Sequence, residues 1–85
     1  MNKTALHTEN APAAIGPYSQ AIRAGDTVYV SGQLPIDPAT GAFAGQDIAS
    51  QTRQSLTNLA NILKEAGATM DNIVKTTVML QNIAD

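Results

Sequence analysis

Alternating apolar and polar positions predict a β-hairpin in the first third of the chain. Residues 19–24 and 27–33 are the two strand candidates, and the second begins with a run of β-branched and aromatic residues. Gly25-Asp26 separates them as a two-residue loop, in which glycine supplies the positive φ of a hairpin turn. Folding the strands about this loop pairs Gln20 with Ser31 and brings Tyr18 close to Ser31.

A three- and four-residue periodicity predicts an amphipathic helix over residues 47–66, with Asp47 as its N-cap and Gly67 as its stop. The core-facing stripe comprises Ile48, Thr52, Ser55, Leu56, Leu59, Ile62, Leu63 and Ala66. The solvent-facing side comprises Gln51, Arg53, Gln54, Asn58, Asn61, Lys64 and Glu65. We interpret the stripe as a face that packs on a sheet.

Three further segments complete the predicted architecture. Residues 1–8 form a short first strand or an arm, and residues 73–80 are rich in β-branched residues and predict a strand. This second strand is expected to lie parallel to a hairpin strand, through a right-handed crossover. Residues 81–85 are typical of the approach to another helix. The prediction is an α+β fold of three or four strands, with one helix on one face and the other sheet face uncovered.

Length and composition narrow the class of protein. The 85 residues indicate one domain. Cysteine is absent and His7 is the only histidine, which argues against disulfides and against a zinc site. A chain of this size buries only roughly 60–65% of the surface that its unfolded form exposes. We therefore expect partner subunits or further chain to supply additional burial.

Charge and hydropathy exclude two kinds of partner. The net charge is −2, the five basic residues are scattered, and only three residues are aromatic. This pattern is unlike a phosphate-backbone footprint or a base-stacking platform, so we expect no nucleic-acid partner. No apolar run reaches membrane-spanning length, and the N-terminus lacks the apolar core of a signal peptide. The sequence predicts a soluble cytoplasmic protein without a membrane partner.

Ser31-Gly32, at the end of the second hairpin strand, is the one candidate for chemistry. It joins a hydroxyl to a backbone without a side chain, and Pro35 and Pro38 stiffen the loop that follows. Two readings remain open from pattern alone: a corner that faces a ligand, or a strand that simply ends at a turn. Phosphate-binding loops, nucleophile elbows and metal-ligand clusters are all absent from the sequence. A lone serine without a neighbouring base is not an activated nucleophile.

Four blocks resemble the RidA/YjgF family of reactive intermediate deaminases. They are NAPAAIGPYSQ at residues 10–20, VSGQLP with DPATG at 30–41, QTRQSL at 51–56 and IVKTTV at 73–78. The resemblance implies a chorismate-mutase-like fold in a homotrimer, with sheets lining a central barrel and the sites in clefts between subunits. It also implies hydrolysis of enamine and imine intermediates, of the 2-aminoacrylate and 2-iminobutanoate type, to 2-oxo acids and ammonia without a cofactor or metal. By the same resemblance, Tyr18, Ser31 and Gly32 match substrate-binding cleft residues.

The chain departs from the family pattern in one respect. The family's carboxylate-binding arginine and water-positioning glutamate occur in segments that these 85 residues do not contain. Arg23 and Arg53 do not occupy the arginine's motif, and Glu9 and Glu65 do not occupy the glutamate's. We therefore expect residues 1–85 to be a single truncated domain, the N-terminal two thirds of such a protein. Alternatives are a non-catalytic trimer that binds small metabolites, and an inactive fragment.

Overall fold

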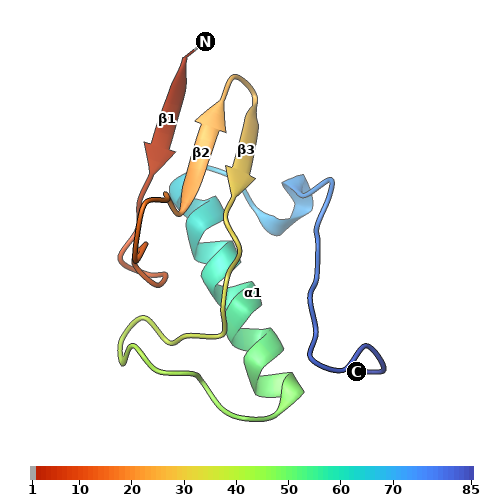
Figure 1. The fold of residues 1–85 in the computed structure, drawn as a ribbon. Helices are drawn as coiled ribbons and strands as arrows, with labels where there is room; N and C mark the ends of the chain where they lie inside the picture. The colour runs from red at the N-terminus through yellow and green to blue at the C-terminus, as the bar shows by residue number, and fades with distance from the viewer. Residues whose placement is uncertain (1) are drawn as a thin grey trace.

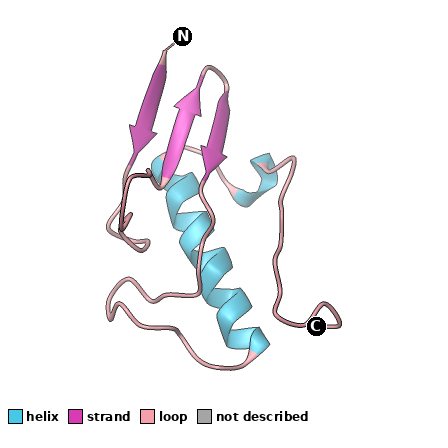
Figure 2. Ribbon diagram, in the orientation of Figure 1, coloured by secondary structure: helices cyan, strands magenta, loops and turns pink. Residues whose placement is uncertain are grey.

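A computed structural model describes residues 2–85 as a three-stranded antiparallel sheet with one long helix behind it (Figures 1 and 2). The elements are β1 (Lys3–Leu6), β2 (Ala21–Ala24), β3 (Thr27–Val30), α1 (Ile48–Glu65) and the 3-10 helix η1 (Met70–Asn72). The strand order is β1-β2-β3, so chain neighbours are also sheet neighbours. This arrangement confirms an α+β fold of a small sheet on a helix.

The predicted hairpin is present. Ala24 pairs with Thr27 across the turn, and Gly25 adopts the positive φ of 61° that the turn requires. The expected first strand is also present as β1, which pairs antiparallel with β2; Met1 lies outside the described residues. Both hairpin strands are shorter than predicted. Backbone pairing extends one step beyond β3, through a hydrogen bond from the Ser31 N–H to the Gln20 carbonyl. The Ser31 hydroxyl donates to the next carbonyl, that of Ser19, and the chain then leaves the sheet.

Helix α1 has the predicted ends. The Asp47 carboxylate accepts a hydrogen bond from the Ser50 backbone N–H at 3.0 Å, which satisfies one donor of the first turn. Gly67 has a φ of 80° and follows the C-cap, and the Ala68 N–H donates to the Leu63 carbonyl at 2.8 Å. This left-handed glycine with its backward bond forms a Schellman ending. Local chemistry alone therefore determines both ends of the helix.

The hydrophobic core lies under the C-terminal half of α1. Ala11, Ala21 and Ile62 form the buried cluster, against which Leu6, Val28 and Val30 pack. Figure 1 shows that the N-terminal half of α1 extends beyond the ends of the short strands. The sheet covers only part of the helix for this reason.

The predicted orientation of α1 is wrong from its N-terminal end to its middle. Ile48 and Leu56, assigned to the core stripe, are exposed, and Leu56 retains 47% of its accessible surface. Asn58, assigned to solvent, is fully buried. The physical reason is that this part of the helix packs on the loop that follows β3, and that the contacts between them are polar. The helix side that carries Ile48 and Leu56 is not covered by any apolar surface of residues 2–85.

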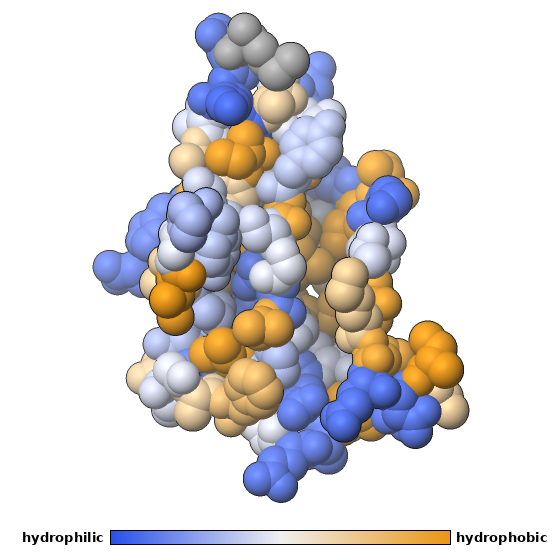
Figure 3. Space-filling model, viewed as in Figure 1, coloured by the Kyte–Doolittle hydropathy of each residue, from blue (hydrophilic) through white to orange (hydrophobic). Residues whose placement is uncertain are grey.

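The strand predicted over residues 73–80 is also wrong, and so is its parallel crossover. The segment carries no strand pairing, and Val74 and Met79 are 98% and 90% exposed. It runs apart from the sheet in Figure 1, and hydrophobic side chains gather along its path in Figure 3. β-branched residues favour an extended chain, but a strand needs a partner edge to satisfy its backbone groups. Residues 82–85 form a turn, in the segment described above as the approach to another helix.

Neither helix within residues 2–85 combines the length and hydropathy of a membrane span.

Candidate functional site

The corner after β3 is anchored to the start of β2. The Ser31 N–H donates to the Gln20 carbonyl at 3.0 Å, and the Ser31 hydroxyl donates to the Ser19 carbonyl at 2.5 Å. The predicted pairing of Gln20 with Ser31 is thereby confirmed. Because the hydroxyl proton is donated to the Ser19 carbonyl, Ser31 can offer only the lone pairs of its oxygen, as an acceptor. Within residues 2–85, no hydrogen bond joins Ser31 to a basic side chain, so the arrangement does not suit a serine nucleophile.

Gly32 leaves its backbone open on the surface. A Cβ added at this residue would meet no atom within 4 Å, and its φ lies outside the left-handed region. Neither backbone conformation nor packing therefore requires glycine here. A glycine without either reason is consistent with close approach of a ligand to the backbone. The substrate-facing role of Gly32 stays a prediction.

Tyr18 lies one residue before the carbonyl that holds Ser31. Its ring is 52% exposed, and its hydroxyl accepts a hydrogen bond from the Ile15 N–H at 3.3 Å. The side chain is therefore turned back on its own loop, and no hydrogen bond joins it to Ser31 among the described residues. The structure brings the backbones of the two residues together, while the role of the tyrosine in a cleft stays a prediction.

Gln20 fixes the loop that carries Tyr18, which the sequence did not predict. Its side chain is nearly fully buried, and its Oε1 accepts from the Thr8 N–H at 2.8 Å. Its Nε2 donates to the carbonyls of Thr8 at 3.1 Å and Pro12 at 2.8 Å. Pro12 itself has no N–H, so this part of the loop lacks one backbone donor. The signal in the sequence that could have indicated this role is a run rich in proline and alanine that a single glutamine follows.

Asn58 performs a similar task on the other side of the corner. Its Nδ2 donates to the carbonyls of Leu34 at 3.1 Å and Ile36 at 2.9 Å, and its Oδ1 accepts from Gln54 Nε2 at 2.8 Å. Helical periodicity placed both amides on the solvent side. The loop after β3, whose position is set by the tertiary structure, buries Asn58 fully and leaves Gln54 half-buried.

Charged groups contribute little to the corner. The Arg23 guanidinium donates to the Ala66 carbonyl and so binds the C-terminal end of α1. The one resolved titration effect lies at Asp47, where hydrogen bonds from the Ser50 side chain and backbone hold the pKa of the carboxyl below its usual 3.8. Residues 2–85 contain no group of three side chains suited to hold a metal ion. The described corner thus offers hydrogen-bonding groups and space, but no charge.

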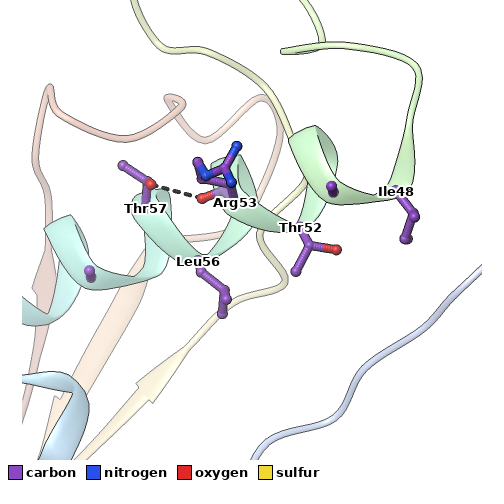
Figure 4. A pocket seen from close by; sticks show the side chains of 7 residues that line it. Ile48, Thr52, Arg53, Leu56 and Thr57 are labelled. Atoms are coloured by element: carbon purple, nitrogen blue, oxygen red, sulfur yellow. Dashed lines mark hydrogen bonds between the residues drawn. The ribbon is translucent and has the colours of Figure 1, made fainter. Parts of the chain in front are cut away.

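A hollow on the surface lies elsewhere, along α1 (Figure 4). This open groove of about 550 Å³ is lined by Ile48, Ala49, Thr52, Arg53, Leu56, Thr57 and Ala60. Its lining is mainly apolar, and the Thr57 hydroxyl is already bound to the Arg53 carbonyl at 2.7 Å. The groove is the uncovered helix face rather than a site with convergent polar groups.

Known proteins share this sequence and this fold. The chain is 52% identical, over all of its 85 residues, to the 2-iminobutanoate/2-iminopropanoate deaminase of Salmonella typhimurium, of which it spans 65%. The crystal structure of YyfA, a Rid-family protein of Yersinia pestis, matches 86% of the chain with a TM-score of 0.84 and 52% identity, over 58% of its own length. The structure of E. coli TdcF with bound serine matches 84% of the chain with a TM-score of 0.80 and 39% identity, over 55% of its own length.

The chain spans between 46% and 67% of the length of the curated relatives compared with it. The model of the Endoribonuclease L-PSP family matches residues 8–85, which is nearly the whole chain. The matched region contains all four sequence blocks described above, together with the β3 corner. The chain therefore belongs to the Endoribonuclease L-PSP family, which includes the RidA/YjgF proteins.

Proposed function

We propose that this protein hydrolyses reactive enamine and imine intermediates to 2-oxo acids and ammonia, with Tyr18, Ser31 and Gly32 lining the substrate cleft. One observation carries the proposal: an open glycine backbone stands beside an anchored serine at the end of β3. The chain in which it occurs is 52% identical to a protein named 2-iminobutanoate/2-iminopropanoate deaminase.

The proposed hydrolysis needs few groups from the protein. Water adds to the electrophilic imine carbon, a proton moves to nitrogen, the C–N bond breaks, and the 2-oxo acid and ammonia leave. No cofactor is needed, because binding in the correct orientation and stabilising developing charge are sufficient. In this proposal the backbone at Gly32 receives the substrate carboxylate. Ser31 accepts a hydrogen bond from the substrate N–H, since its own hydroxyl proton is donated to the Ser19 carbonyl.

The proposal assigns the remaining parts of the site to residues that this sequence does not contain and to neighbouring subunits. The segments that would supply a carboxylate-binding arginine and a water-positioning glutamate are not among these 85 residues. The proposal places the site at the interface of a homotrimer. The exposed apolar side chains of residues 73–80 and of the sheet support it, since Val74 and Tyr29 both lack cover within the described chain.

The test couples the protein to a pyridoxal-phosphate threonine dehydratase acting on threonine, and it follows the release of 2-oxobutanoate. The proposal expects faster release than from the dehydratase alone, in proportion to the protein added. Ser31→Ala should lower this acceleration, whereas Thr40→Ala, a hydroxyl removed from an exposed turn of the next loop, should not. Release that is no faster with the protein than without it would refute the proposed activity.

A second candidate function is binding of small amino acids or 2-oxo acids without turnover. The relative TdcF, whose structure holds bound serine, favours it. Titration of the protein with serine and with 2-oxobutanoate, followed by NMR shifts at Gly32, distinguishes the two functions when it is combined with the turnover assay. Cleavage of RNA, which the family description suggests, is disfavoured by the net charge of −2 and the scattered basic residues.

A further inference from the structure

We infer that Asn58 is a positioning residue, which holds residues 32–36 against α1 and thereby sets where the Gly32 backbone stands. Its effect on turnover rests on the proposed function, whereas its effect on the loop does not. Neither helical periodicity nor the sequence motifs of the corner include this residue.

The environment of Asn58 is unusual for a helical asparagine. None of its surface is accessible, and every hydrogen of its amide is used: one goes to the Leu34 carbonyl and one to the Ile36 carbonyl. Gln54, one turn earlier, donates to Oδ1 at 2.8 Å and so fixes which way the amide faces. Because the amide is buried and all of these hydrogen bonds are made, it fixes the positions of both carbonyls relative to α1.

The loop has few other ways to hold its position. Pro35 lies between the two bound carbonyls and has no N–H of its own. Its carbonyl accepts from Ala44 within the same loop, and the Ile36 N–H donates to the Leu34 carbonyl only two residues away. Among the hydrogen bonds of residues 2–85, those of Asn58 alone join residues 32–36 to α1. The contact spans 24 residues of sequence, so it ties two distant parts of the fold.

Gly32 thus lies between two anchors. On one side, Ser31 is bound to the start of β2 by its N–H and its hydroxyl. On the other, Leu34 is bound to α1 by Asn58. Only Gly32 and Gln33 lie between these points, so their path has little freedom while both anchors hold. Loss of the second anchor releases the backbone that the proposed substrate would meet.

The central variant is Asn58→Leu, which keeps a similar side-chain volume and removes both donors. The matched control is Asn61→Leu, one helical turn further along, which removes a single bond from Asn61 Nδ2 to the Asn10 carbonyl at 2.7 Å. Gln54→Met is the second variant, because it leaves Asn58 in place and removes only the donor that orients it. It carries the test if Asn58→Leu does not fold.

The first measurement is amide hydrogen exchange with backbone NMR shifts. For Asn58→Leu we expect the Ile36 and Ala44 amides to exchange at least about tenfold faster relative to the helix interior, with displaced shifts at Gly32. Gln54→Met should give the same pattern more weakly, and Asn61→Leu should leave it unchanged. Wild-type exchange and shifts at these amides in a folded Asn58→Leu or Gln54→Met variant would overturn the inference, as would an equal change in the Asn61→Leu control.

The second measurement is turnover, corrected for the folded fraction. We expect KM for the imine to rise about tenfold in Asn58→Leu with kcat within about twofold, because a released backbone weakens carboxylate binding. A purely structural role would lower the folded fraction and leave KM unchanged, which would overturn the link to the site. If the wild type neither hydrolyses imines nor binds 2-oxobutanoate, the proposed function fails, and the exchange data still decide whether Asn58 positions the loop.

Discussion

Gly32→Ala is the sharpest single change that the structure allows, because it separates the needs of the fold from the needs of a ligand. The added methyl group would point into open space, with no atom within 4 Å. The φ of Gly32 is not in the left-handed region, so alanine can adopt it. The fold should therefore accept the substitution without strain.

Gly32→Ala is expected to raise the stability of the protein and to lower its affinity for the ligand. An alanine that fits the native backbone restricts the unfolded chain and stabilises a protein by about 0.4–1 kcal/mol. For a domain of this size, that corresponds to a rise in Tm of about 2–8 °C. For a ligand that must contact the Gly32 backbone, the methyl group creates an overpacked contact worth about 1–3 kcal/mol. This converts to a loss of affinity of about 5- to 150-fold.

The assay measures Tm by circular dichroism and Kd for 2-oxobutanoate by NMR titration on the same samples. Gly25→Ala is the matched control, since a Cβ there also meets no atom within 4 Å, but φ is 61°. The strained turn should lower the free energy of unfolding by about 1–2 kcal/mol and leave affinity unchanged in the folded fraction. Gly32→Ala should thus lower affinity without lowering stability, whereas Gly25→Ala should lower stability without lowering affinity.

Two results would refute the reasoning. Unchanged affinity and turnover in a stable Gly32→Ala variant would show that no ligand approaches this backbone, and the corner would be no more than the end of a strand. Destabilisation by Gly32→Ala would show that an unseen neighbour, such as another subunit, fills the space beside Gly32. The second result would move attention from substrate to interface.

Further predictions concern stability. Hydrogen bonds from Ser50 lower the pKa of Asp47, so the stabilisation by this cap is fully present above pH 3.8 and is lost as the pH falls through the lower folded value; Asp47→Asn should remove that dependence from a series of Tm measurements between pH 2 and 6. Gln20→Leu should cost at least about 2 kcal/mol by chemical denaturation, because it strands the Thr8 N–H and several carbonyls; a cost under about 0.5 kcal/mol would contradict the anchoring role. Ile62→Ala should cost about 2–5 kcal/mol, whereas Leu56→Gln should change stability by less than about 0.5 kcal/mol, and a large cost for Leu56→Gln would reveal cover on the groove face.

The features that the sequence predicted correctly depend on near neighbours in the chain. Gly25-Asp26 determines a hairpin because the turn and its flanking pairs lie within a few residues. Asp47 and Gly67 determine the ends of α1 for the same reason. The pairing of Gln20 with Ser31 followed from counting outward from the turn, so one part of the candidate corner was predictable.

The features that the sequence did not predict depend on distant partners. Residues 73–80 have the composition of a strand, yet no edge within residues 2–85 pairs with them. Leu56 has the periodicity of a core residue, yet no described surface reaches it. Composition measures a preference, and whether the preference is realised depends on which surfaces the rest of the fold supplies.

Asn58 shows that the same limit applies to polar residues, and it suggests a remedy. Periodicity assigns a helical asparagine to solvent because burying an unpaired amide costs free energy. The assignment fails when a loop elsewhere has carbonyls that can accept hydrogen bonds from the amide. Around Pro35, which has no N–H, the loop has one backbone donor fewer than it has carbonyls. The proline-rich segment near Pro12 and the buried Gln20 form a second case. In both, a loop that contains a proline meets a carboxamide from another part of the fold, on α1 in one case and directly before β2 in the other, and both loops border the same corner. Proline-containing loops and the carboxamides on nearby elements should therefore be considered together when a site is sought from sequence.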